Sequence, residues 1–85
     1  MLTLQDCIAF CGLTEDQLEA IARHQHLADV VAAEWAENML ATEGGCEIIE
    51  TILCDEVACA RAQGDVRRAR RYETGLGAFR ARRAR

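Results

Sequence analysis

Five cysteines and two histidines are the residues of this sequence most able to bind a metal or to act as nucleophiles. Cys7 and Cys11 are four residues apart, so on a helix they share one face and can supply two of the four ligands that a structural zinc ion needs. Leu4 and Ile8 lie on that same face, however, and free cysteine behaves as a small buried hydrophobic residue. We therefore expect Cys7 and Cys11 to be reduced and packed in the core.

The other thiols and imidazoles give weaker signals for chemistry. His24 and His26 are two residues apart, which on a helix points them away from each other, so we expect surface or capping histidines. Cys46 opens a helix, a position that favours a thiolate, but Glu43 and Glu47 beside it oppose that ionisation. The sequence holds no glycine-rich phosphate loop and no nucleophile elbow. We expect no catalytic activity, no metal and no cofactor.

Glu56 is the acid whose position is least expected. It falls inside the apolar arc of its helix, which includes Ile49, Ile52 and Leu53, and an acid that faces a core must be paired, hydrogen-bonded or protonated. Either this side of the helix is exposed, or Glu56 is mostly buried and pairs with an arginine of the last helix or of a partner chain. We predict the second arrangement. The candidate partners are Arg67, Arg70 and Arg71.

Charge is divided unevenly along the chain, whose net charge is −4. Residues 1–60 hold twelve acids and one base, a balance of −11, whereas residues 61–85 hold nine arginines and two acids, a balance of +7. Lysine is absent. The arginine-rich segment therefore has an acidic body of the same chain close at hand, and we expect its arginines mainly to neutralise that body or a partner's.

Start and stop signals divide the chain into about five short helices. Proline is absent and the apolar fraction is 51% with 5% aromatic residues, a composition typical of a helical core of aliphatic side chains. Thr3 and Thr14 stand at N-cap positions, and Gln17 completes a capping box with Thr14. The helices expected after the first span about 15–26, 28–41, 46–63 and a segment after Asp65; the predicted breaks are Gly12, residues 43–45 and Gly64. The fold class predicted is all-α, a compact bundle.

The chain is expected to be a single domain over residues 1–85. An acidic body of four helices occupies 1–60, and 61–85 hold the end of the fourth helix and an arginine-rich amphipathic helix. A buried stripe is predicted along this last helix, and we expect its end, the RARRAR of residues 80–85, to be frayed. The stripe consists of Val66, Ala69, Tyr72, Leu76 and Phe79.

Apolar side chains outside the core are candidates for a contact surface. Phe10 lies off the stripe of the first helix, and Trp35 or Tyr72 is expected to reach the surface. In the third helix the steps of four from Leu27 predict one apolar face. Its members are Leu27, Val31, Trp35 and Met39, beside Val30 and Leu40.

The order of LTLQDC, GLTEDQL and ARAQGD resembles short all-helical bacterial proteins that have no assigned activity. The resemblance implies the fold and no functional residue. We expect a small helical protein–protein interaction or regulatory module, in the cytoplasm, that binds a protein partner or forms a homodimer. No apolar run is long enough to cross a membrane. The alternative is a nucleic-acid-binding protein that uses the arginine-rich helix, which the charge of the body disfavours.

Overall fold

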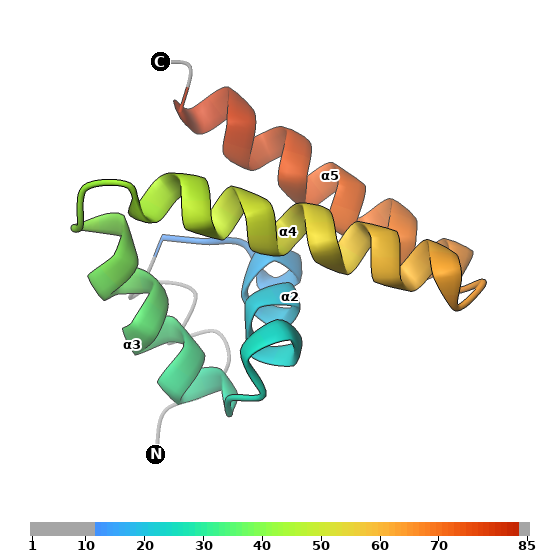
Figure 1. Cartoon of the computed structure of the whole chain (residues 1–85), viewed down its shortest axis with the longest axis horizontal. Helices are drawn as coiled ribbons and strands as arrows, with labels where there is room; N and C mark the ends of the chain where they lie inside the picture. Colours follow the sequence, from blue (N-terminus) through green and yellow to red (C-terminus); the bar gives the residue numbers. More distant parts are fainter. Residues whose placement is uncertain (1–11, 84–85) are drawn as a thin grey trace.

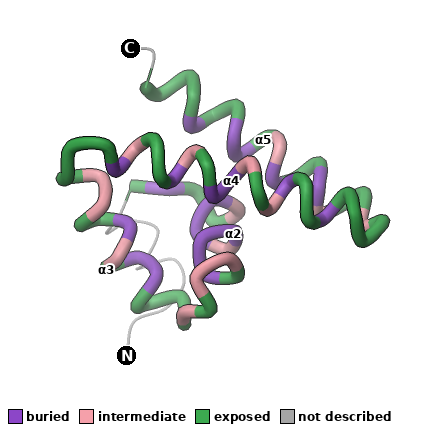
Figure 2. Tube along the Cα trace, viewed as in Figure 1, coloured by how far each residue is buried: buried purple, intermediate pink, exposed green. Residues whose placement is uncertain are grey.

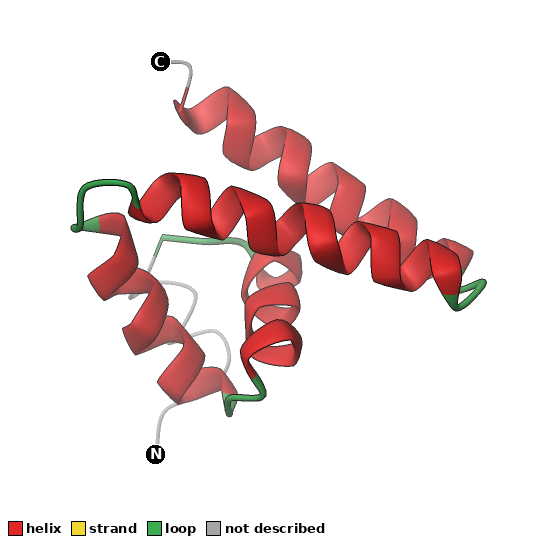
Figure 3. Ribbon diagram, in the orientation of Figure 1, coloured by secondary structure: helices red, strands yellow, loops and turns green. Residues whose placement is uncertain are grey.

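The computed structural model describes residues 12–83, which form four helices and no strand (Figure 3). The all-α class is confirmed. The first predicted helix falls in residues 1–11, outside the described residues, so the structure gives four helices where about five were expected. In chain order the helices are α2 (Glu15–Gln25), α3 (Asp29–Leu40), α4 (Gly45–Ala62) and α5 (Val66–Arg83). None of these four is long and apolar enough to span a membrane.

Helix α4 runs through the middle of the molecule (Figure 1). After the turn at residues 63–65, α5 returns beside α4, while α2 and α3 form a bent pair that also contacts α4. Helix α2 contacts both α3 and α5, but no Cα atom of α3 comes within 8 Å of α5. The backbones of α3 and α5 therefore do not pack against each other.

Local hydrogen bonds fix where the helices begin. The backbone N–H of Gln17 donates to Thr14 Oγ1 at 3.2 Å, and the N–H of Thr14 donates to Gln17 Oε1 at 2.9 Å, so the predicted capping box is confirmed. Asp65 caps α5 by accepting from the N–H of Arg68 at 3.1 Å. At the other end of α2, His26 adopts the left-handed conformation with φ 55° and closes the helix.

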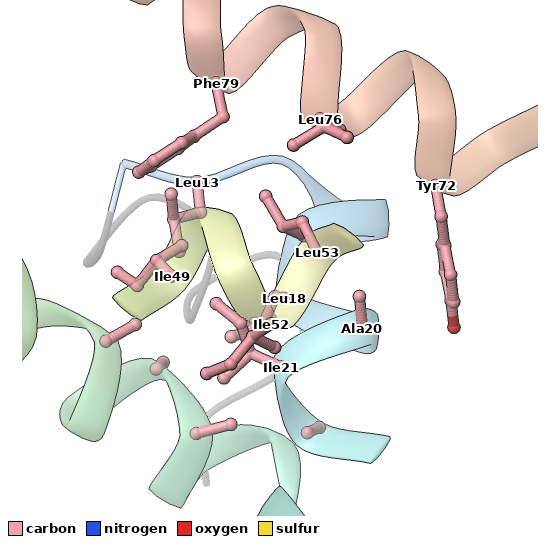
Figure 4. Packing of buried hydrophobic residues seen from close by; sticks show 14 of the residues in the cluster. Leu13, Leu18, Ala20, Ile21, Ile49, Ile52, Leu53, Tyr72, Leu76 and Phe79 are labelled. Carbon is pink, nitrogen blue, oxygen red and sulfur yellow. The ribbon is translucent and has the colours of Figure 1, made fainter. Parts of the chain in front are cut away.

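The core lies where α2, α4 and α5 meet (Figure 4). Four of the five predicted stripe residues of α5 are buried, and Tyr72 is fully so, which contradicts its expected place at the surface. Val66 is 60% exposed, so the stripe begins at Ala69 instead. The largest fully buried side chains are Tyr72, Phe79, Leu13, Leu18, Ile21, Ile49 and Leu53.

The predicted apolar face of α3 is only partly confirmed, because Leu27, Trp35, Met39 and Leu40 are half-buried and pack against the core but the two valines do not. Val30 and Val31 are 42% and 48% exposed, and the helix turns its alanines inward. Buried and exposed stretches alternate along α3 in Figure 2. Small side chains let the backbone of α3 approach α2 and α4 closely, because interaxial distance depends on the side chains at the contact. The inward alanines are Ala32, Ala33 and Ala36.

The α3–α4 turn also depends on close approach. Gly45 is buried at the start of α4, and a Cβ there would overlap the carbonyl group of Met39. Only glycine fits without moving the backbone. This turn sets the angle between α3 and α4. It thereby determines which face of α3 points toward solvent.

Candidate interaction surface

Glu56 is largely buried as predicted, but its partner lies elsewhere than expected. Its side chain is 12% exposed, and Arg23 of α2 approaches Glu56 Oε1 with its Nε at 3.7 Å. The predicted pairing with an α5 arginine is therefore wrong. Charge balance did not indicate Arg23, because it is the single base among residues 1–60, although it lies in the last turn of α2, which packs against α4.

Arginines of α5 bind acids of α2 and α4. Arg71 pairs with Asp16 at 3.0 Å and with Glu19, and Arg83 pairs with Glu50 at 2.7 Å and Glu47 at 3.0 Å. These are the acids of the predicted body. The expectation that α5 neutralises its own chain is confirmed for these side chains.

Residues 80–83 are helical and in contact with the rest of the chain, contrary to the expected frayed end. Arg80 Nε lies 3.6 Å from Glu50 Oε2, and Arg82 Nη1 donates to the carbonyl oxygen of Gly12 at 2.9 Å. Together with the pairs of Arg83, these contacts hold the last described turn of α5 against the body.

A buried tyrosine closes the α2–α5 contact. Tyr72 Oη donates to Glu19 Oε2 at 2.9 Å, and the Arg71 guanidinium lies 5.8 Å from the centre of the Tyr72 ring. Burial, the hydrogen bond to Glu19 and its negative charge all raise the pKa of the Tyr72 hydroxyl. Desolvation is the largest single effect on Arg71 and lowers its pKa, but the charges of Glu19 and Asp16 and the hydrogen bond to Asp16 together outweigh it, so the pKa of Arg71 is raised. The Tyr72 hydroxyl is therefore held in its neutral form, as the donor to Glu19.

Arg67 and Arg70 stand apart from this network. Both side chains are exposed, and within residues 12–83 neither has an ion-pair or side-chain hydrogen-bond partner. They lie on the outer face of α5 near the exposed Val66. The structure thus separates the three predicted arginines: Arg71 pairs within the chain, and the other two face solvent.

The outer face of α3 carries acids without partners, as the outer face of α5 carries arginines without partners. Glu34 and Glu37 are exposed, and neither has a cationic partner within residues 12–83. They share this face with Val30 and Val31, and α3 contains no basic residue. Among acids of α2 and α4, by contrast, most are in ion pairs. We call Val30, Val31, Glu34 and Glu37 the acidic α3 face.

A shallow pocket of about 480 Å³ opens between α2 and α4. Its histidines are engaged in the fold: His24 Nε2 lies 3.3 Å from Asp55 Oδ2, and His26 caps α2. The hydrogen-bond partner of the Cys59 sulfur in the described residues is Gln63, not a histidine. No group of three metal-binding side chains occurs within residues 12–83. The lining residues are Ala22, Arg23, His24, His26, Glu56 and Cys59.

The remaining residues predicted to form a contact surface or to have a reactive thiol do not form a site in the described residues. Trp35 is half-buried and packs against the core, so it borders the acidic α3 face without forming its centre. Cys46 is also half-buried and packs against the core, in agreement with a structural role. Phe10, Cys7 and Cys11 lie outside the described residues.

Comparison of the chain with protein-family models, with curated proteins and with solved structures finds no match. The resemblance to short helical bacterial proteins therefore stays a prediction.

Proposed function

We propose that this chain is a small helical protein-interaction module without catalytic activity, and that the acidic α3 face is its contact surface. The observation that carries the proposal is the pattern on this face. Two exposed valines stand beside Glu34 and Glu37, whose charges have no counterion within residues 12–83. Apolar area that a partner can bury next to unpaired charge fits a protein segment that offers arginine or lysine with apolar side chains.

The proposal keeps two sequence-based expectations. The partner is a protein, either a different chain or a second copy in a homodimer. The location is the cytoplasm, because the cysteines are odd in number and Cys46, Cys54 and Cys59 are free thiols, as is usual in a reducing compartment.

Ion pairing supports a protein partner over nucleic acid. Arg71, Arg80 and Arg83 are engaged with acids of the chain, so phosphates would have to displace these contacts. Arg67 and Arg70, which have no ion-pair or side-chain hydrogen-bond partner within residues 12–83, are few for phosphate binding, and residues 1–60 carry a charge balance of −11.

An NMR titration tests the proposal with a basic amphipathic peptide of about 20 residues, long enough to be helical. We expect shifts of backbone amides along the acidic α3 face at about 150 mM salt. The matched controls are the E34Q/E37Q variant and a peptide with glutamate in place of arginine, and both should bind more weakly. Shifts located elsewhere, or equal binding of the two peptides, would contradict the proposal. Submicromolar binding of duplex DNA would favour the alternative function.

A further inference from the structure

Two helix faces of opposite charge lack partners within the described chain. On α3, Val30, Glu34 and Glu37 follow the spacing i, i+4, i+7 and are all exposed. On α5, the exposed Arg67, Arg70 and Thr74 follow i, i+3, i+7. Both sets therefore form straight stripes on the solvent side of their helices.

These stripes cannot meet within one molecule. Helix α4 runs between the two helices in Figure 1, and no Cα atom of α3 lies within 8 Å of α5. Charges on the two outer faces can be neutralised by each other only between different copies.

We infer that the acidic α3 face of one copy docks antiparallel on the outer face of α5 in a second copy. This inference rests on the proposed function and names the partner. In this register Glu34 faces Arg70 and Glu37 faces Arg67. The two acids and the two arginines are each three residues apart, about 4.5 Å along a helix axis, so one alignment forms both ion pairs.

The same register also buries the exposed Val30 against the second copy. Val30 lies opposite Thr74, and the next residues on that face of α5 are Gly77 and Ala78, which are small and exposed. No atom lies within 4 Å of a Cβ built on Gly77, so this part of α5 is open surface. Small residues there let the two helices approach until Val30 is covered.

Such a contact joins two different surfaces, and each copy carries one of each. Two copies can therefore form a closed two-fold dimer only when both α3–α5 contacts form at once. If each pair of copies makes one contact, the copies assemble into a ring or an open filament. This property makes the inference testable by mixing variants.

Sedimentation velocity of the full chain at low salt measures the association. The E34Q/E37Q variant keeps only the α5 surface, and R67Q/R70Q keeps only the α3 surface. Each alone should self-associate roughly 2- to 30-fold more weakly than the wild type for every contact formed, because each contact loses two exposed ion pairs. An equimolar mixture should form a dimer with one copy of each. Mixing that restores nothing would overturn the inference.

Charge reversal tests the register. E34R should weaken association on the order of tenfold, and R70E in the same chain should restore it, whereas R67E should weaken it further. The matched control is E15R, because Glu15 is exposed and unpaired within residues 12–83 but lies on α2. Equal rescue by R70E and R67E would contradict this register.

The outcomes separate the two proposals. A wild-type chain that stays monomeric at low salt while the acidic α3 face still binds the basic peptide overturns docking between copies and leaves the proposed function standing. Failure of the peptide to bind, with association between copies intact and sensitive to E34R, would restrict the surface to self-recognition. Loss of both would refute both proposals.

Discussion

The side-chain amide of Gln17 donates a hydrogen bond of 2.8 Å to the carbonyl oxygen of Gly75, 58 residues further along the chain. Gln17 is 4% exposed, and its other amide atom, Oε1, accepts from the N–H of Thr14. One side chain therefore caps α2 and ties it to α5. The arrangement requires the amide, because a donor and an acceptor are both used.

Replacing Gln17 by glutamate should be more destabilising than replacing it by alanine. Q17E keeps the acceptor for Thr14 but sets a carboxylate oxygen against the Gly75 carbonyl, and we expect a loss of about 2–4 kcal/mol at pH 7, against about 1–2 kcal/mol for Q17A. Urea denaturation measures both. Burial favours the protonated acid in Q17E, so the difference between the variants should shrink as the pH falls. A Q17E chain as stable as the wild type would contradict this account.

Two glycines in α5 should respond oppositely to alanine. A Cβ on Gly75 would lie 3.3 Å from Cγ of Gln17, whose amide is held by two hydrogen bonds and cannot easily move, so G75A should destabilise by about 1 kcal/mol. Gly77 has no atom within 4 Å of an added Cβ, and G77A should stabilise by roughly 0.5–1 kcal/mol through helix propensity. Thermal unfolding of the pair decides this, and stabilisation by both substitutions would show that α2 and α5 are not in close contact.

The hydroxyl of Tyr72 predicts a stability loss in alkali. Its pKa is raised in the folded chain by burial, by the hydrogen bond to Glu19 and by the charge of that acid. A raised pKa means that the folded state holds its proton longer than the unfolded state, so this contribution is full below about pH 10 and declines above it. Tyr72 is the one tyrosine of the chain, so tyrosinate absorbance reports it alone.

The Y72F variant isolates this effect. It should lose about 1–2 kcal/mol at neutral pH, since a hydrogen bond to a charged acceptor is removed, and its stability should depend less on pH between about 9 and 11. Tyrosinate formation at an ordinary pKa while the fold stays intact would exclude the buried hydrogen bond.

The ion pairs of Glu50 should make the stability of the C-terminal turn of α5 depend on salt concentration. It accepts from Arg83 at 2.7 Å and lies 3.6 Å from Arg80, and its side chain is 29% exposed. E50Q should therefore cost about 0.5–1.5 kcal/mol at low salt and less at about 0.5 M salt, where exposed pairs are screened. The matched control is E43Q, whose acid is exposed and has no partner within residues 12–83. Equal effects of the two variants would mean that these ion pairs contribute nothing.

Caps and strong stripes were predictable from the sequence because they depend on neighbours along the chain. The Thr14–Gln17 box and the stripe from Ala69 to Phe79 follow from local spacing alone. Ala69 was recognised as buried because larger apolar residues continue its stripe.

The inward face of α3 was not predictable in this way. Valine is more hydrophobic than alanine, so periodicity favours burying Val31, whereas the close approach of α3 to its neighbours selects Ala32 and Ala36. The predicted partner of Glu56 was wrong for a related reason. Charge balance along the chain indicates an arginine of α5, whereas the packing of α2 on α4 is what brings Arg23 close to Glu56. The amide bridge from Gln17 to Gly75 gives no periodic signal, although a glycine within a predicted helix marks a possible close contact.

The three-residue turn between α4 and α5 bears on the order in which the chain folds. Asp65 N–H donates to the Ala60 carbonyl at 2.9 Å, and the pairing of these two helices closes a short loop, whereas the bridge between Gln17 and Gly75 closes one of 58 residues. Loop entropy therefore favours an early α4–α5 hairpin, onto which α2 docks later. In refolding kinetics A60G and A69G should slow folding, while A20G in α2 should mainly speed unfolding. If A20G slowed folding while A60G and A69G mainly sped unfolding, the folding nucleus would lie in α2 instead.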